Sequence, residues 1–161
     1  MRSLRKPQLD LRLDAAAPDA AIRWHPGATI LCRGRALRLQ LDNAHSQATQ
    51  ENDVLHLPLP PQATPRQIQD RAEAWLREQA MHHLTQLIAE KSALAGRRAP
   101  RLALSFAARS HWIEVQDADT VRCHWRLIEQ PGAVIAQAIE RALAMLPPAP
   151  QAVDLFATAG H

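Results

Sequence analysis

The chain has 161 residues, and 19 Lys and Arg against 16 Asp and Glu give it a formal net charge of +3 at pH 7. This length and a hydrophobic fraction of 47% predict one domain with a core of its own. The small positive excess permits nucleic-acid binding without indicating it. Cys32 and Cys123 form no C-x-x-C pair and no disulfide framework, which is typical of a cytoplasmic protein.

The two ends of the chain carry little periodicity. Residues 1–22 are rich in Ala, Asp and Arg, and no apolar run long enough for a signal peptide or a membrane span follows the early basic residues. We therefore expect a flexible N-terminal tail over 1–22, one domain over 23–147, and a second tail over 148–161. The alternative for the N-terminal residues is that their LDLRLD run adds an edge strand. The expected location is the cytoplasm, without membrane contact.

Strands are predicted at the start of the domain. Thr29–Arg33 and Arg35–Asp42 alternate in polarity around Gly34, which predicts a hairpin. A polar loop is expected over residues 43–52. Val54–Leu59 follows as a third strand, and its prolines predict a place near a sheet edge.

A long helix is predicted next. Thr64, Pro65 and Gln67 form a start signal with a capping box, and Gly96 marks the end just after Ala95. The apolar residues between them recur at helical spacing, which predicts one buried stripe. Its members are Ile68, Ala72, Trp75, Leu76, Ala80, Leu84, Leu87 and Ile88.

A strand with Leu102, Leu104 and Phe106 facing inward precedes the clearest alternation in the chain, a hairpin over residues 112–127. One face of this hairpin is apolar, with Ile113, Val115, Val121, Cys123, Trp125 and Leu127. The other face carries Trp112, Glu114, Arg122, His124 and Arg126. We take Trp112, His124 and Arg126 as the candidate binding residues of an exposed face. The alternative is that the long helix covers Trp112 and the charges face water.

The last predicted element is a helix over about 133–146, ended by prolines. It is expected to bury Val134, Ile135, Ala138, Ile139, Ala142, Leu143 and Leu146. Together the elements predict an α+β fold, with a small, mostly antiparallel sheet packed against one long helix and this second helix.

The order of elements over Arg101–Leu146 resembles the SprT-like/YgjP-like metallopeptidase domain. In that family a strand leads into an R-W-G-S-C-like segment, a returning strand ends N-W-R-L-I, and the next helix carries H-E-x-x-H. Trp112 and Trp125-Arg126-Leu127-Ile128 match this pattern. The resemblance covers about 21–146. It implies that the family's N-terminal region and the segment that supplies a third zinc ligand are missing here.

The resemblance places Arg141, Ala142 and Met145 where the family has its two zinc-binding His and its catalytic Glu. Arg has no acceptor for a cation, Ala offers no base, and a lone Met thioether suits zinc poorly. The family's catalytic positions are therefore expected to bind no metal, and we expect no cofactor.

The remaining histidines do not suggest another metal site. His82 and His83 are adjacent on a helix and diverge by about 100°. His111 and His124 fall on opposite faces of the predicted hairpin. We therefore expect structural histidines, and the prediction for metal ligands is none.

Three functions remain open from the sequence. The first is a catalytically inactive metallopeptidase-like domain that binds a protein partner or forms a homodimer. The second is a metal-dependent hydrolase whose ligands have moved to other residues. The third is nucleic-acid binding through Arg-rich loops that carry Arg33, Arg35, Arg38, Arg97, Arg98 and Arg101.

Overall fold

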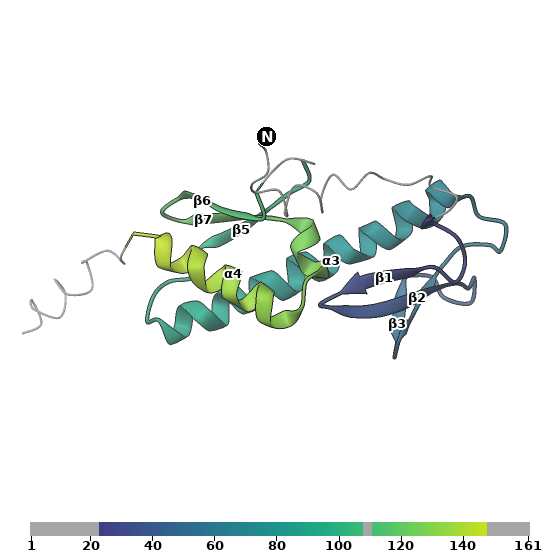
Figure 1. Cartoon of the computed structure of the whole chain (residues 1–161), viewed down its shortest axis with the longest axis horizontal. Coiled ribbons are helices and arrows are strands. Elements are labelled where there is room, and N and C mark those ends of the chain that lie inside the picture. The colour runs from purple at the N-terminus through teal and green to yellow at the C-terminus, as the bar shows by residue number, and fades with distance from the viewer. Residues whose placement is uncertain (1–22, 108–110, 148–161) are drawn as a thin grey trace, which may run out of the picture.

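A computed structural model describes residues 23–107 and 111–147, and it confirms the α+β class. Seven strands, two α-helices and a 3-10 helix follow one another in the described part of the chain (Figure 1). In chain order they are β1 (Thr29–Cys32), β2 (Arg35–Leu41), β3 (Thr49–Glu51), β4 (Val54–Leu57), α3 (Pro65–Leu94), β5 (Arg101–Ser105), β6 (Ile113–Asp117), β7 (Thr120–His124), η1 (Trp125–Glu129) and α4 (Gly132–Met145). The predicted tails over 1–22 and 148–161 lie outside the described residues.

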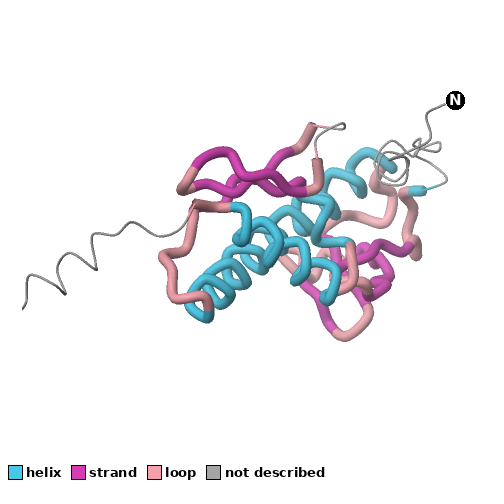
Figure 2. Tube along the Cα trace, turned by 60° about the vertical axis from the view of Figure 1, so that its left-hand side comes forward, coloured by secondary structure: helices cyan, strands magenta, loops and turns pink. Residues whose placement is uncertain are grey.

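The strands form two mixed sheets instead of one. The first has the order β1-β2-β4-β3 and the second the order β5-β7-β6. Three of the pairings are antiparallel, whereas β2 with β4 and β5 with β7 are parallel. Figures 1 and 2 show the two sheets well apart, with the helices between them. Each sheet buries one face against helices, so two small sheets can share a helical centre.

The predicted hairpin at the start of the first sheet is confirmed. Arg33 and Gly34 form its two-residue turn, with φ of 53° and 80°. Positive φ at both turn positions suits the right-handed twist of the flanking strands. The polar loop expected over 43–52 is partly wrong, because Thr49–Glu51 forms β3. As a result β4 lies between β2 and the edge strand β3, which agrees with the predicted place near a sheet edge.

The long helix α3 is confirmed. Thr64 accepts a hydrogen bond from the Gln67 amide, and the Gln67 side chain accepts one from the Thr64 amide, so the predicted capping box is present. The helix ends at Leu94, and Gly96 follows with a positive φ of 67°. Its predicted stripe is buried apart from Leu87, which is half-buried.

The second hairpin ends earlier than the alternation indicates. β7 stops at His124, and residues 125–129 turn into the 3-10 helix η1. This change from strand to 3-10 helix buries Trp125, Leu127 and Ile128 against α3. It also buries His124, which is 2% exposed. The predicted pairing of Glu114 with Arg122 is confirmed. Phe106, expected to face inward, is exposed, and an Arg77 guanidinium lies over its ring.

The helix α4 packs on α3 and β6 through Ile135, Ile139, Ala142 and Leu143. Val134 was expected in the core but is exposed. It belongs to the first turn of α4 and directly precedes the buried Ile135. Within the described residues, no helix combines the length and the apolarity needed to cross a bilayer.

Candidate functional site

The last turn and a half of α4 offers no metal ligand. Arg141 and Met145 are exposed, and Ala142 is buried in the core. Across the whole helix the one acidic residue is Glu140, which pairs with Lys91 of α3, and α4 contains no His, Cys or Asp. These residues do not fit a zinc ion, which takes nitrogen, sulfur or carboxylate ligands.

The three candidate binding residues of the second hairpin do meet, but inside the fold. The Trp112 ring lies edge-on to the His124 ring, with 6.1 Å between centroids, and Trp112 packs half-buried against the core. The His124 Nε2 lies 3.0 Å from the Ala107 carbonyl, and its Nδ1 accepts a hydrogen bond from the Arg126 amide. The expectation of an exposed face is therefore wrong for His124, which caps η1 instead.

Arg126 is the centre of a charge network between η1 and α3. Its guanidinium donates to Glu129 at 3.0 Å and to Glu73 of α3 at 3.3 Å, and it lies over the Trp125 ring at 4.6 Å. Arg77 reaches Glu73 at 3.6 Å and covers the same ring. Glu73 is 8% exposed, so this network supplies the partners that a buried carboxylate requires.

Burial shifts the pKa values of the two titratable side chains at the ends of η1. Burial raises the pKa of the Glu129 carboxyl above its usual value, and Arg126 and Arg23 oppose that rise. Burial lowers the pKa of the His124 imidazole, with the Ala107 hydrogen bond acting in the opposite direction. Side chains with shifted pKa values can mark functional sites, but Glu129 and His124 each have a partner within the fold that explains why they are buried.

The turn of the first hairpin docks on the end of η1 and on Pro131, which precedes α4. The amides of Arg33 and Gly34 donate to the carbonyls of Ile128 and Glu129, at 2.6 and 3.1 Å. A Cβ on Gly34 would lie 2.9 Å from the Pro131 Cα, so no other residue fits without a shift. This contact ties the first sheet to the start of α4.

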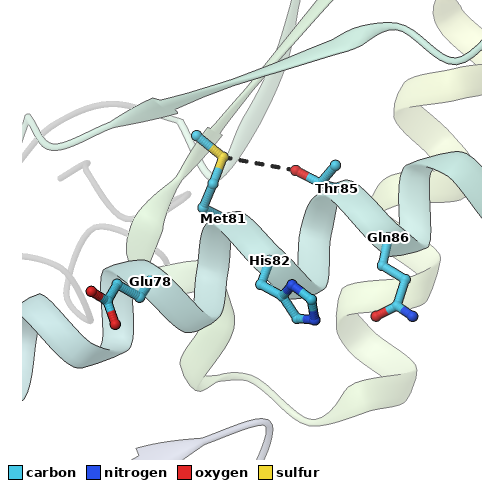
Figure 3. Close-up of a pocket in the computed structure, with 5 residues that line it drawn as sticks. All are labelled: Glu78, Met81, His82, Thr85 and Gln86. Carbon is cyan, nitrogen blue, oxygen red and sulfur yellow. Dashed lines mark hydrogen bonds between the residues drawn. The ribbon is translucent and has the colours of Figure 1, made fainter. Parts of the chain in front are cut away.

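The outer face of α3 forms a shallow hollow, shown in Figure 3. Met81 and Thr85 lie on one side of the helix, and the Thr85 hydroxyl is 3.7 Å from the Met81 sulfur. Glu78, His82 and Gln86 recur at a spacing of four on the neighbouring side. These residues come from one helix alone, so no second element completes a catalytic arrangement with them.

One group of residues in the described ranges could hold a metal ion. Asp42, His45 and His56 each offer a ligand atom, and these atoms lie within 4.8 Å of one another. The group is at the first sheet and does not include α4. The sequence reasoning missed it because the three residues belong to a loop and a strand whose pairing was not foreseen.

The comparisons with known proteins agree with the resemblance. The family model described as YgjP-like, metallopeptidase domain matches residues 4–137, which is most of the chain. The chain therefore belongs to the YgjP-like metallopeptidase domain family. The match ends within α4, before Arg141. Neither a curated protein nor a solved structure matches the chain.

Proposed function

We propose that this chain is a catalytically inactive domain of the metallopeptidase family that acts by binding another protein chain. The proposal rests on the chemistry of α4, where the resemblance aligns Arg141, Ala142 and Met145 with the ligands and the base of the family motif. A hydrolytic zinc site needs three protein ligands and an open position for water. The three aligned residues offer no such ligand, and the one carboxylate of α4, Glu140, pairs with Lys91, which supports a role other than hydrolysis.

The ends of α3 and α4 offer a surface for such a partner. Leu94 is 84% exposed at the end of α3, beside a groove whose apolar lining continues through Leu143, Ala144 and Leu146. Met145 is 62% exposed on α4 nearby in sequence. An exposed apolar side chain beside a groove with apolar residues in its lining is a common feature of protein interfaces. Trp112 is a weaker anchor than its sequence position indicates, since it packs against the core.

Association can be tested with a second copy of the chain as the first partner. We expect sedimentation equilibrium of the wild type to show dimers that increase with concentration. Leu94→Asp should weaken the dimer by about tenfold or more, because it places a charge in an apolar contact. Leu31→Asp is the matched control, because Leu31 is 50% exposed on β1, away from the groove. Equal effects of both variants, or a wild type that stays monomeric, would count against this self-association.

The catalytic part of the proposal has its own test. Purified protein incubated with an unfolded protein substrate, with and without added zinc, should give no metal-dependent cleavage. Cleavage that requires zinc and disappears with a chelator would instead favour a hydrolase with relocated ligands.

The Arg-rich loops give less support to nucleic-acid binding. Arg35 pairs with Asp53, and the Arg97 guanidinium donates to the carbonyls of Leu143 and Pro147. These two cations are engaged within the molecule, so they are less available for phosphates.

A further inference from the structure

Two histidines and an aspartate meet at the carboxyl end of the parallel β2–β4 pair. Asp42 directly follows β2, His45 lies three residues later in the loop, and His56 is in β4. The register pairs Gln40 with His56, and the Asp42 amide donates to the Leu57 carbonyl at 2.8 Å. The parallel pairing therefore brings Asp42 beside His56, although 14 positions separate them in the sequence.

The spacing of the three side chains suits one small cation. The Asp42 Oδ2 lies 3.4 Å from the His56 Nδ1 and 3.7 Å from the His45 Nε2. Zinc binds His nitrogen and carboxylate oxygen at about 2.0–2.2 Å, so ligands at neighbouring corners of its tetrahedron lie about 3.3–3.6 Å apart. These two separations fall close to that range, and all three ligand atoms lie within 4.8 Å of one another, so moderate side-chain movements would close the group around a zinc-sized ion.

The surrounding groups orient each ligand toward the common centre. The Glu51 carboxylate of β3 lies 3.1 Å from the His56 Nε2, so it can hold a ring proton there, and the tautomer protonated at Nε2 is the one in which Nδ1 can bind a cation. The His56 Nδ1 is buried and makes no hydrogen bond among the described residues, although the Asp42 carboxylate lies within ion-pair distance of it. The Ala44 amide donates to Asp42 Oδ1 at 2.9 Å, so Oδ2 is the oxygen that faces the histidines.

A cation would also complete the contacts of the group. It would lie between the Asp42 carboxylate and the two imidazole rings, whose centroids are 5.0 Å apart. The buried His56 Nδ1, which makes no hydrogen bond, would gain a bond to the ion.

We infer that Asp42, His45 and His56 bind a divalent transition-metal cation of the zinc type, with Glu51 as the group that orients His56. Imidazole and carboxylate together favour zinc, nickel or copper over calcium or magnesium. Three protein ligands leave one position for water or another ligand. This site goes beyond the proposed function, and it differs from the sequence-based expectation of no metal ligands. Its expected role is to fix the loop after β2 against the first sheet.

Zinc titration of the untagged full chain tests the site. Isothermal calorimetry should show one equivalent of zinc bound with a Kd below about 10 μM. His45→Gln, His56→Gln and Asp42→Asn should each weaken binding by at least about tenfold, and Glu51→Gln by about tenfold as an orienting residue. His82→Gln, which changes an exposed histidine of α3, should bind zinc as the wild type does.

Zinc should also raise the melting temperature of the wild type but not that of the His45→Gln/His56→Gln double variant. His45 is in a loop, so His45→Gln alone keeps the test informative if His56→Gln fails to fold. Absence of saturable binding, or unchanged binding in the double variant, would overturn the inference. These outcomes are distinguishable from those of the proposed function, because the sedimentation assay tests a surface at α3 and α4 and the peptidase assay measures cleavage, whereas this test measures zinc binding.

Discussion

The His124 imidazole joins three parts of the second half of the chain. It ends β7, caps the first turn of η1 through Nδ1, and holds the Ala107 carbonyl through Nε2. Only the neutral ring can accept at one nitrogen while it donates at the other. Protonation of His124 therefore removes the cap of η1.

The lowered pKa of His124 sets the direction of a pH effect on stability. A group whose pKa is lower in the folded chain contributes stability above its unfolded pKa of about 6.5, and this stability is lost as the pH falls. The wild type should therefore lose stability between about pH 7 and pH 5, with His83, whose pKa burial also lowers, acting in the same direction.

The variant His124→Gln measures how much His124 contributes to this loss of stability at low pH. The variant should lose about 1 kcal/mol at pH 7.5 because the cap is lost, and its unfolding free energy should then fall less steeply toward pH 5 than that of the wild type. Urea unfolding at a series of pH values measures both quantities. His82→Gln should keep the wild-type slope, and an unchanged slope in His124→Gln would contradict this assignment.

Arg126 permits a second test at the scale of one residue. Arg126→Ala leaves the buried Glu73 and the partly buried Glu129 without their shared cation, so we expect a loss of about 3 kcal/mol in unfolding free energy. Arg66→Ala removes an exposed i,i+4 pair with Asp70 and should cost about 0.5 kcal/mol or less. Similar small losses of unfolding free energy in the two variants would show that water can solvate Glu73 and Glu129 once Arg126 is removed.

Among the elements, the β1–β2 turn carries the contact between the first sheet and the start of α4. Gly34→Ala and Gly27→Ala both place an alanine at positive φ, which costs about 1 kcal/mol or somewhat more. A new Cβ at Gly34 also meets the Pro131 backbone, whereas one at Gly27 meets nothing within 4 Å. Gly34→Ala should therefore be less stable than Gly27→Ala by about 2 kcal/mol. Equal losses in thermal unfolding would mean that the hairpin does not dock tightly.

Elements whose signals are local could be predicted from the sequence. The capping box and Gly96 gave the bounds of α3 closely, and Gly34 located the first turn. The short β3 was missed because residues 49–51 are polar and become a strand only through their pairing with β4. η1 was missed because the alternation of residues 121–127 continues past His124, while the α3 surface favours a tighter turn that buries Trp125, Leu127 and Ile128.

For the whole molecule, the family and the α+β class could be read from Trp112, the Trp125–Ile128 segment and the order of elements. The proposed metal site could not, because it depends on long-range pairing. Asp42 and His45 look like loop residues, and His56 looks like one polar position of a strand. Only the parallel β2–β4 register and the insertion of β3 bring these residues and Glu51 together. The periodicity of the sequence gives no information about which strands pair.

The lack of a metal ligand at residues 141–145 of α4 leads to a prediction about the molecule as a whole. Arg141→His, Ala142→Glu and Met145→His together restore the family motif, with both new histidines at exposed positions one helical turn apart. We still expect no efficient zinc-dependent proteolysis, because an open catalytic site needs a third protein ligand. Among the described residues, α4 takes part in no metal-binding group that could provide it.

Measurement of zinc-dependent cleavage of an unfolded protein checks the triple variant. The variant should be compared in the His45→Gln/His56→Gln background, so that the proposed first-sheet site does not take up the metal. Weak zinc binding by the new histidine pair without cleavage is the expected result. Robust cleavage that a chelator abolishes would show that the chain does supply a third ligand to α4, with His161 the first residue to test, since it lies outside the described residues.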